Sequence, residues 1–416
     1  MEIRKILILG AGKSSISLID YLVEHAQTER WTITVADISA ELALLKTKGR
    51  PATSAIDIDL NQDSERQALL QAHDIIISML PAALHLTIAK DCLQLRKNLV
   101  TPSYISPAMK ELGNEVEQNG LLFMNEMGLD PGIDHMSAMQ IIDRLHQDGN
   151  QIVGFRSHCG GLVAPESDTN SWHYKFSWNP RNVVLAGQGD GGIRWKENGS
   201  IQEINYEQLF TSTASIDLGK DGLYESYPNR DSLKYIAEYG LENIETMYRG
   251  TLRVPPFCKG WNALVQSGFT KANGSVPFLK EDAITNETIM TLLKEIDVLE
   301  ISNSDKNAAD FLQQQLEQKW AMQTTDKDLV VMVHEIEYLR DNQKHKLQSS
   351  LYLKGKDSEH TAMALTVGLP IAIVTKLILN KKLQRTGILM PKYADIYEPV
   401  LEELKAYGVS FEEKEM

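Results

Sequence analysis

The chain has 416 residues, of which 43% are hydrophobic and 24% are charged. This balance is typical of soluble globular proteins, and it excludes disorder, a collagen-like sequence and a disulfide scaffold. The length predicts two or three domains of roughly 100–200 residues each. The 56 acidic residues outnumber the 42 basic ones, and the formal charge of -14 argues against nucleic acid and anionic membrane surfaces as partners.

Neither a metal centre nor a membrane span is expected. The three cysteines, Cys92, Cys159 and Cys258, lie far apart and match neither a disulfide framework nor the paired spacing of zinc ligands. The apolar run before Gly10 is too short for a signal peptide. We find no run of about 18 apolar residues that could cross a bilayer, and we therefore expect a cytoplasmic protein.

The first 130 residues alternate between strand and helix patterns. Short apolar or β-branched runs predict six strands, at residues 5–10, 32–37, 52–60, 74–78, 98–101 and 121–125. Helical patterns separate these runs, and Pro81 and Pro107 each suit the first position of a helix. Six strands separated by helices predict an α/β fold with a Rossmann-type doubly wound parallel sheet.

The pattern changes after residue 130. Glycine, proline and aromatic residues cluster between His158 and Pro256, which favours an antiparallel or mixed sheet. The other expected elements are strands at 151–157, 183–186, 328–338 and 346–354, a small helical insertion at about 281–325, a buried helix at 361–379 and a solvated tail from Glu412. We therefore expect a dinucleotide-binding domain at residues 1–130, completed by about 361–416, and an α+β substrate-binding domain at 131–360.

Gly10 and Gly12 lie between the first predicted strand and the first predicted helix, in the run Gly-Ala-Gly-Lys-Ser-Ser. The first glycine permits a tight turn, and the second lets the backbone approach a pyrophosphate at the helix N-terminus. Ser15 replaces the third glycine of the fingerprint, and a lone Gly-x-Gly could mean only a turn. Asp37 ends the second strand, where a carboxylate would accept hydrogen bonds from ribose hydroxyls, unless it merely caps the next helix.

Polar residues also follow the fourth and fifth strands, whose carboxyl ends meet at the crevice where such sheets bind ligands. Ser78 and Leu80 come at the end of the fourth strand, although Leu80 could simply pack in the core. Ser103 and Tyr104 follow the fifth strand and offer two hydroxyls. The alternative for Tyr104 is that it only caps a helix.

Residues 125–135 follow the sixth strand and are rich in turn formers. Asp130 precedes Pro131 and should be extended, whereas Asp134 could be no more than a helix cap. Further along, Cys159 is followed by two glycines that would bring the backbone close to a bound molecule. Cys159 could equally be a small buried hydrophobe, which is the common role of a lone cysteine.

Arg230, Arg249 and Arg253 lie in turn-rich segments. A planar guanidinium binds a carboxylate through two parallel hydrogen bonds, which a lysine cannot do. A solvated surface role is the alternative for each arginine. The glycines and prolines around Arg230 and Arg253 favour recognition of a carboxylate-bearing substrate.

Taken together, these segments resemble the glutamate-forming saccharopine dehydrogenases, also called saccharopine reductases. The most specific segment reads Asn125-Glu-Met-Gly-Leu-Asp-Pro-Gly-Ile-Asp-His135. The other matching segments are residues 103–109, 159–162, 164–167, 175–178, 227–231, 249–253 and 361–364. The resemblance runs through the whole chain and implies a reversible hydride transfer. Saccharopine, an oxidised nicotinamide cofactor and water would give L-glutamate and 2-aminoadipate 6-semialdehyde.

The resemblance and the residue patterns together assign candidate roles. The candidate cofactor-binding residues are Gly10, Gly12, Lys13, Ser14, Asp37, Ser78, Leu80, Leu129, Asp130, Pro131, Ser177 and Trp178. The candidate substrate-binding residues are Ser103, Tyr104, Arg230, Thr251, Leu252 and Arg253. The catalytic candidates are Tyr104, Asp130 and Cys159, because proton movements near the substrate nitrogen need a group of tunable pKa.

The predicted cofactor is NAD, with NADP as the alternative. Fungal members that use the phosphorylated cofactor carry an arginine or another non-acidic residue near the end of the second strand. This chain carries Asp37 there, and its charge would repel a 2′-phosphate.

Two rival functions stay open. A carboxynorspermidine-type dehydrogenase should have acidic pocket residues in place of the arginines. A non-catalytic dinucleotide-binding regulator would have lost Arg230 and Arg253. We expect a homodimer whose partner is a small-molecule substrate.

Overall fold

The computed structural model describes residues 3–188, 192–301 and 305–416, and the chain divides into two compact units. Unit 1 comprises Met1–Ile141 and Met363–Ser410, and unit 2 comprises Ile142–Ala362 and Phe411–Met416. Unit 1 continues past the predicted boundary at residue 130, because the helix α7 (Ile133–Gln147) begins within it. The predicted helical insertion includes residues 302–304, which lie outside the described part of the chain.

Unit 1 is built on a parallel sheet, in which seven of the described strands take part. They lie in the order β15-β6-β5-β4-β1-β2-β3, and every neighbouring pair is parallel. The strands are β1 (Arg4–Leu9), β2 (Trp31–Asp37), β3 (Thr53–Asp57), β4 (Ile75–Ser78), β5 (Asn98–Val100), β6 (Leu122–Met124) and β15 (Gly387–Leu389). The order reverses between β1 and β4, which confirms the predicted doubly wound fold. β15 was not predicted, because so short a strand has no readable periodicity.

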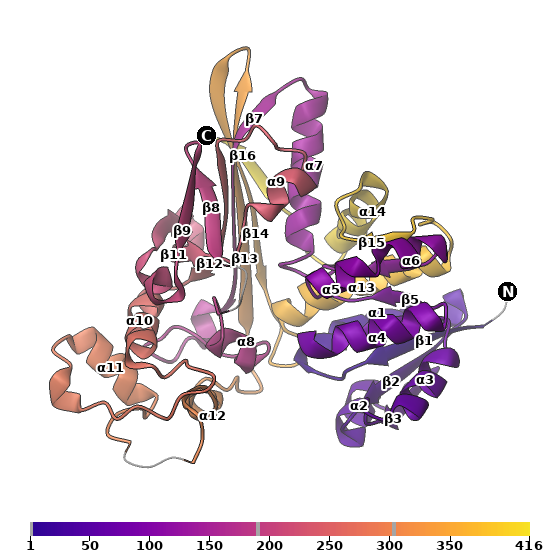
Figure 1. The fold of residues 1–416 in the computed structure, drawn as a ribbon, viewed down its shortest axis with the longest axis horizontal. Helices are drawn as coiled ribbons and strands as arrows, with labels where there is room; N and C mark the ends of the chain where they lie inside the picture. Colours follow the sequence, from indigo (N-terminus) through magenta and orange to yellow (C-terminus); the bar gives the residue numbers. More distant parts are fainter. Residues whose placement is uncertain (1–2, 189–191, 302–304) are drawn as a thin grey trace. The chain divides into compact units, whose positions relative to one another are not determined.

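Helices cover both faces of this sheet (Figure 1). They are α1 (Ile16–Glu29), α2 (Ala40–Thr47), α3 (Asp63–Gln71), α4 (Ala82–Gln94), α5 (Pro107–Glu111), α6 (Gly113–Gln118), α13 (Ala362–Leu379) and α14 (Ala394–Lys405), together with the start of α7. Leu7 and Leu9 of β1 share a core cluster with residues of α3, α4 and α6. Ile6 and Ile8 point to the other face and are also fully buried, as a strand covered on both sides requires.

The helix α13 is long and apolar enough to cross a membrane by length and composition alone. Its 18 residues have a mean hydropathy of 2.1, so the expectation that no such run exists was wrong. Of that stretch, 72% is buried inside the protein. A Cβ atom on its Gly368 would lie 2.7 Å from the backbone nitrogen of Leu18, so α13 packs directly against α1. It is therefore placed as a core helix.

Unit 2 contains a mixed sheet, in which nine of the described strands take part. The main path runs β10-β11-β12-β7-β13-β14-β16, and β8 pairs with both β12 and β9. The strands are β7 (Gln151–Val163), β8 (Ile193–Glu197), β9 (Ser200–Ile204), β10 (Ala214–Asp217), β11 (Leu223–Pro228), β12 (Thr246–Arg253), β13 (Asp328–Arg340), β14 (Gln343–Lys354) and β16 (Glu412–Glu415). Only the pairing of β12 with β7 is parallel among these described strands, which confirms the predicted mixed sheet.

Two predictions for unit 2 were wrong. Residues from Glu412 are exposed, as expected, but they do not form a tail, because β16 pairs with β14. This pairing also moves residues 411–416 out of the predicted dinucleotide-binding domain. The strand expected at 183–186 overlaps the helix α8 (Pro180–Val184). Asn179 caps that helix and Pro180 occupies its first turn, and these two local signals outweigh the β-branched pair of valines.

Unit 2 has four further helices among its described residues, and the last three of them surround a core rich in aromatic side chains. The four helices are α9 (Lys234–Glu238), α10 (Phe257–Ser267), α11 (Glu287–Glu295) and α12 (Ala308–Lys319). The last two form the predicted helical insertion. The aromatic members of the core are Trp172, Tyr174, Phe176, Phe210, Tyr227, Phe257, Trp261, Phe269, Phe311 and Trp320. Each unit thus has its own core and presents its own candidate site residues.

Candidate functional site

The glycine loop of unit 1 has the geometry that dinucleotide binding requires. Gly10 has a φ of 101°, and a Cβ atom there would lie 2.9 Å from the carbonyl oxygen of Met79, so only glycine fits. Gly12 is exposed, and a Cβ atom on it would meet nothing within 4 Å. Lys13 and Ser14 form the short 3₁₀ turn that leads into α1. The loop therefore leaves backbone open at a helix N-terminus, where a pyrophosphate would bind.

The carboxylate of Asp37 is hydrogen-bonded to the backbone of this loop. One of its carboxylate oxygens, Oδ2, accepts a hydrogen bond from the backbone N–H of Ala11 at 2.7 Å. The other oxygen, Oδ1, accepts one from the N–H of Ser39 at 3.0 Å. The cap of α2 is Ser39 itself, whose side chain accepts from the N–H of Leu42. Asp37 is therefore not the helix cap that was the alternative, and its charge is held beside the glycine loop.

Ser78 and Leu80 face the interior. Ser78 is fully buried, and its Oγ lies 2.8 Å from Nδ1 of His85. Burial lowers the pKa of His85 to about 4, so the imidazole is neutral at pH 7. Leu80 packs against the core cluster of α3 and α4. A cofactor contact at Ser78 would therefore come from the backbone, and that role stays a prediction.

Two loops of unit 1 bring Tyr104 and Asp130 together. The Tyr104 hydroxyl donates a hydrogen bond to Oδ1 of Asp130 at 3.0 Å, although the two residues are 26 positions apart. Both side chains are half-buried, whereas Leu129 and Pro131 are buried. The turn depends on Gly132, since a Cβ atom there would lie 2.0 Å from the carbonyl oxygen of Gly128. A phenol and a carboxylate in contact can hold and pass a proton.

In unit 2, strand register places three site candidates on one face of the sheet. Cys159 of β7 pairs with Thr251 of β12, and Thr251 pairs with Tyr227 of β11. Directly paired residues point to the same face, and so does Arg253, two positions beyond Thr251. Cys159 is buried within this face. Leu252 points to the opposite face, where it is fully buried in a separate apolar cluster, so it could contact a substrate only through its backbone.

Arg253 is a buried cation inside an aromatic cage. Its side chain belongs to a residue that is 2% exposed, and its guanidinium carbon lies 5.1 Å from the ring centres of Tyr174 and Phe257 and 5.7 Å from that of Tyr227. Its Nη1 donates to the carbonyl of Leu252 at 2.8 Å, and no residue in the described part of the chain is hydrogen-bonded to its Nε. Burial raises the pKa of Tyr227 to about 12, so this ring supplies no negative charge.

The remaining candidates of unit 2 differ in exposure. Ser177 is buried, and its Oγ has no hydrogen-bond partner in the part of the chain that the structure describes. Trp178 donates from Nε1 to the Tyr174 hydroxyl at 2.9 Å. They belong to the same unit as Arg253, and the glycine loop belongs to the other. Arg230 is exposed and has a φ of 54°.

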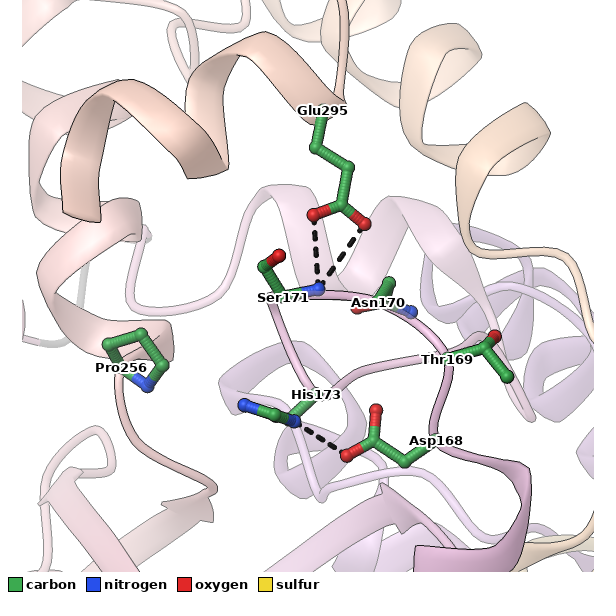
Figure 2. A pocket seen from close by; sticks show the side chains of 7 residues that line it. All are labelled: Asp168, Thr169, Asn170, Ser171, His173, Pro256 and Glu295. Carbon is green, nitrogen blue, oxygen red and sulfur yellow. Dashed lines mark hydrogen bonds and ion pairs between the residues drawn. The ribbon is translucent and has the colours of Figure 1, made fainter. Parts of the chain in front are cut away.

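A cavity of about 500 Å³ lies beside the segment that leads to Tyr174 (Figure 2). Nδ1 of His173 lies 2.6 Å from Oδ2 of Asp168, and the carboxylate of Glu295 accepts from the N–H of Ser171. The sequence patterns did not point to this cavity, because its residues come from a loop, from Pro256 and from the end of α11. Among the described residues, no group of three or more His, Cys, Asp or Glu side chains could hold a metal ion.

The sequence patterns also did not indicate several residues that lie next to the candidate site residues. Tyr174 directly precedes the segment 175–178, and Tyr227 begins the segment 227–231; both rings contact the guanidinium of Arg253. Glu126 and His135 lie within the segment 125–135, and their side chains are 2.9 Å apart at Oε2 and Nε2. The only available signal was their place inside or next to these segments.

A Rossmann domain with an open glycine loop, joined in one chain to a mixed-sheet domain with a buried arginine, defines a two-domain NAD(P)-dependent oxidoreductase. Residues 6–124 match the saccharopine dehydrogenase NADP binding domain, and residues 128–409 match the saccharopine dehydrogenase C-terminal domain. The chain belongs to the saccharopine dehydrogenase family.

Relatives of known name agree with this assignment. The chain is 33% identical to the saccharopine dehydrogenase (NADP(+), L-glutamate-forming) of Saccharomyces cerevisiae, across 99% of both chains. It is 32% identical to the mitochondrial alpha-aminoadipic semialdehyde synthase of Mus musculus, of which it covers 47%.

Two solved structures show the same architecture. Apo saccharopine dehydrogenase (L-Glu forming) from Saccharomyces cerevisiae superposes with a TM-score of 0.88 at 30% identity, covering 99% of this chain and 100% of that one. A homospermidine synthase from Legionella pneumophila in complex with NAD superposes with a TM-score of 0.59, covering 100% of this chain and 92% of that one. Since the identity in the second case is 8%, that likeness shows the fold alone.

Proposed function

We propose that this protein is an L-glutamate-forming saccharopine dehydrogenase. Saccharopine, NAD(P)⁺ and water would give L-glutamate, 2-aminoadipate 6-semialdehyde, NAD(P)H and a proton. The observation that carries the proposal is Arg253, a buried guanidinium whose Nε has no hydrogen-bond partner among the described residues. A buried charge without a counter-charge is costly, so the site is suited to a carboxylate ligand. Saccharopine has three carboxylates, whereas a polyamine-type substrate has fewer anionic groups to offer.

The residues of the chain have distinct tasks in this reaction. A nicotinamide cofactor held at the glycine loop of Gly10 and Gly12 would supply the acceptor for the hydride that leaves the carbon next to the secondary amine. Arg253 would hold a substrate carboxylate through its planar fork and so orient that carbon. Hydrolysis of the resulting imine requires proton transfers at the nitrogen and at the attacking water. We assign these proton transfers to the pair of Tyr104 and Asp130, whose side chains are hydrogen-bonded to each other.

The purified chain, incubated with saccharopine and each oxidised cofactor, tests this function. The expected result is saccharopine-dependent growth of reduced nicotinamide absorbance, with L-glutamate and the semialdehyde as products. Turnover of carboxynorspermidine without turnover of saccharopine would replace the proposal with the rival dehydrogenase. Dinucleotide binding without turnover of either substrate would favour a regulator.

For the cofactor, we propose that NAD is used better than NADP. The support is the carboxylate of Asp37, which two backbone N–H groups hold beside the glycine loop. There it would accept hydrogen bonds from the ribose hydroxyls and repel a 2′-phosphate. The names of the matched domain and of the relatives in yeast support NADP instead. With solvent screening, repulsion by one carboxylate predicts a preference of about 10- to 100-fold for NAD.

The ratio of kcat/KM for the two cofactors at saturating saccharopine decides between them. Asp37→Ser is the matched variant, since a serine keeps a hydroxyl acceptor and removes the charge. It should remove most of the preference and bring the kcat/KM ratio for the two cofactors to within about threefold of one. Equal or better use of NADP by the unmodified protein would contradict the role given to Asp37.

A further inference from the structure

Glu126 joins the two loops that carry Tyr104 and Asp130. It lies just after β6 and is 3% exposed. Its Oε1 accepts a hydrogen bond from the N–H of Ile105 at 3.0 Å, and its own N–H donates to the carbonyl of Ser103 at 2.9 Å. The residues on both sides of Tyr104 are thus attached to one glutamate.

The other oxygen of the same carboxylate reaches the second loop. Oε2 of Glu126 lies 2.9 Å from Nε2 of His135, which is fully buried in the first turn of α7. Nδ1 of His135 lies 3.5 Å from Oδ2 of Asp134, and Oδ1 of Asp134 accepts from the N–H of Gly132 at 2.5 Å. These contacts connect Glu126 to the turn that presents Asp130.

The backbone of Glu126 supports a role beyond packing. Its φ of 54° lies in the left-handed region, which a residue other than glycine adopts only where its surroundings enforce it. Here the enforcing contacts are those to Ser103, Ile105 and His135. Strained residues of this kind gather at sites where geometry matters for function.

We infer that Glu126 and His135 form a positioning pair that sets the contact between Tyr104 and Asp130 during saccharopine turnover. The inference rests on the proposed function, because the Tyr104–Asp130 pair is assigned there to proton transfer. Glu126 and His135 act through the two loops, and neither is itself a catalytic residue. A carboxylate is suited to the task because its two oxygens can face two loops at once.

A double-mutant cycle between Glu126 and Tyr104 tests the inference. Glu126→Ala should lower kcat/KM for saccharopine about 10- to 100-fold, since a displacement of about 1 Å at reacting groups has effects of this size. The dissociation constant for the dinucleotide should rise by a smaller factor than kcat/KM falls, since only the turn at Asp130 is shared with the candidate cofactor contacts. In a Tyr104→Phe background most of the Glu126→Ala loss should disappear, because residues that act through one another are not additive.

Two further variants separate positioning from folding. Glu126→Gln keeps a polar atom facing Ile105 and another facing His135, so its kcat/KM should stay within about fivefold of the value for the unmodified protein. Asp91→Asn is the matched control, because Asp91 is another buried carboxylate of unit 1 and is bonded to Arg66 and Gln67 on the helices. It should lower the melting temperature and leave kcat/KM within about twofold. Hydrogen exchange at Ile105 should accelerate in Glu126→Ala and stay slow in Glu126→Gln.

The outcomes distinguish the inference from the function on which it rests. If the unmodified protein does not turn over saccharopine, the proposed function fails and the positioning role fails with it. If the unmodified protein is active but the losses at Glu126 and Tyr104 are additive, only the positioning role is overturned. Unchanged activity in a folded Glu126→Ala protein, or an equal loss in dinucleotide binding, also overturns it.

Discussion

The guanidinium of Arg253 lies between three aromatic rings, and within residues 3–188, 192–301 and 305–416 its Nε has no hydrogen-bond partner. The rings compensate part of the desolvation of the cation, which lets an unpaired charge persist in the folded protein. Its counterpart Arg230 is exposed, so a carboxylate bound there would remain in contact with water. The two arginines should therefore differ in how much substrate binding depends on them.

Arg253→Lys should lower kcat/KM for saccharopine about 10- to 100-fold, because lysine keeps the charge but loses the two-point geometry. Steady-state kinetics at fixed dinucleotide concentration measure the loss, and circular dichroism checks that the variant is folded. Dinucleotide affinity should be unchanged. A kcat/KM within twofold of the unmodified value would remove Arg253 from the substrate site.

Arg230→Ala should raise the KM for saccharopine and leave dinucleotide affinity unchanged. The expected rise is about 2- to 10-fold, less than at Arg253, because water screens an exposed ion pair. Substrate titrations of the two variants side by side give the comparison. A larger effect at Arg230 than at Arg253 would reverse the assignment of the principal carboxylate contact.

Among the elements, α13 shows how helix packing decides what a single residue tolerates. Its Gly368 approaches the backbone of Leu18 in α1, so no side chain fits between the two helices. Alanine is the better helix former, and propensity alone would favour it at this position. The close contact with backbone, which cannot move aside, outweighs that preference.

Gly368→Ala should therefore destabilise unit 1 by about 1–3 kcal/mol, the usual range for overpacking a core. The matched control is Gly113→Ala in α6, where a Cβ atom would meet nothing within 4 Å. That variant should be neutral or stabilising by up to about 1 kcal/mol. Urea unfolding followed by circular dichroism measures both. If both variants had the same effect, the contact between α1 and α13 would not govern this position.

At the scale of the whole molecule, each unit contains a buried histidine that is kept neutral. Burial lowers the pKa of His85 in unit 1 and of His158 in unit 2 to about 4 in each case. In the unfolded chain each titrates near 6.5, so between about pH 6.5 and pH 4 the unfolded state binds more protons. The contribution of these two histidines to the free energy of unfolding is fully present above about pH 6.5 and is lost as the pH falls towards 4.

Lowering the pH from 7 to 5 should therefore destabilise the units by about 2 kcal/mol for each of these histidines. Thermal unfolding measured across this range should show a melting temperature that falls as the pH is lowered. His85→Asn should flatten the pH dependence of unit 1 and leave that of unit 2 unchanged. A pH-independent melting temperature would contradict the neutral state of both residues.

The sequence by itself determined the order of the Rossmann strands, the glycine loop and the mixed character of the second sheet. These features depend on local patterns: continuous apolar runs for buried parallel strands, and glycines where a turn demands them. The motifs also pointed to Arg253, Tyr104 and Asp130 as separate candidates. Where local signals conflicted, as at residues 183–186, the pattern of valines misled because the cap of α8 is a stronger signal.

Only the tertiary structure decided which of these residues meet. Tyr104 and Asp130, which meet, are 26 positions apart, and the rings around Arg253 come from different segments of unit 2. Glu126 and His135 are nine positions apart, but only the fold of the turn between them brings their side chains together. The pairing of β16 with β14 is of the same kind, since nothing in a short charged tail predicts a partner. Sequence periodicity reports which face of an element is buried. It does not report what lies against that face, because long-range packing and register bring those neighbours together.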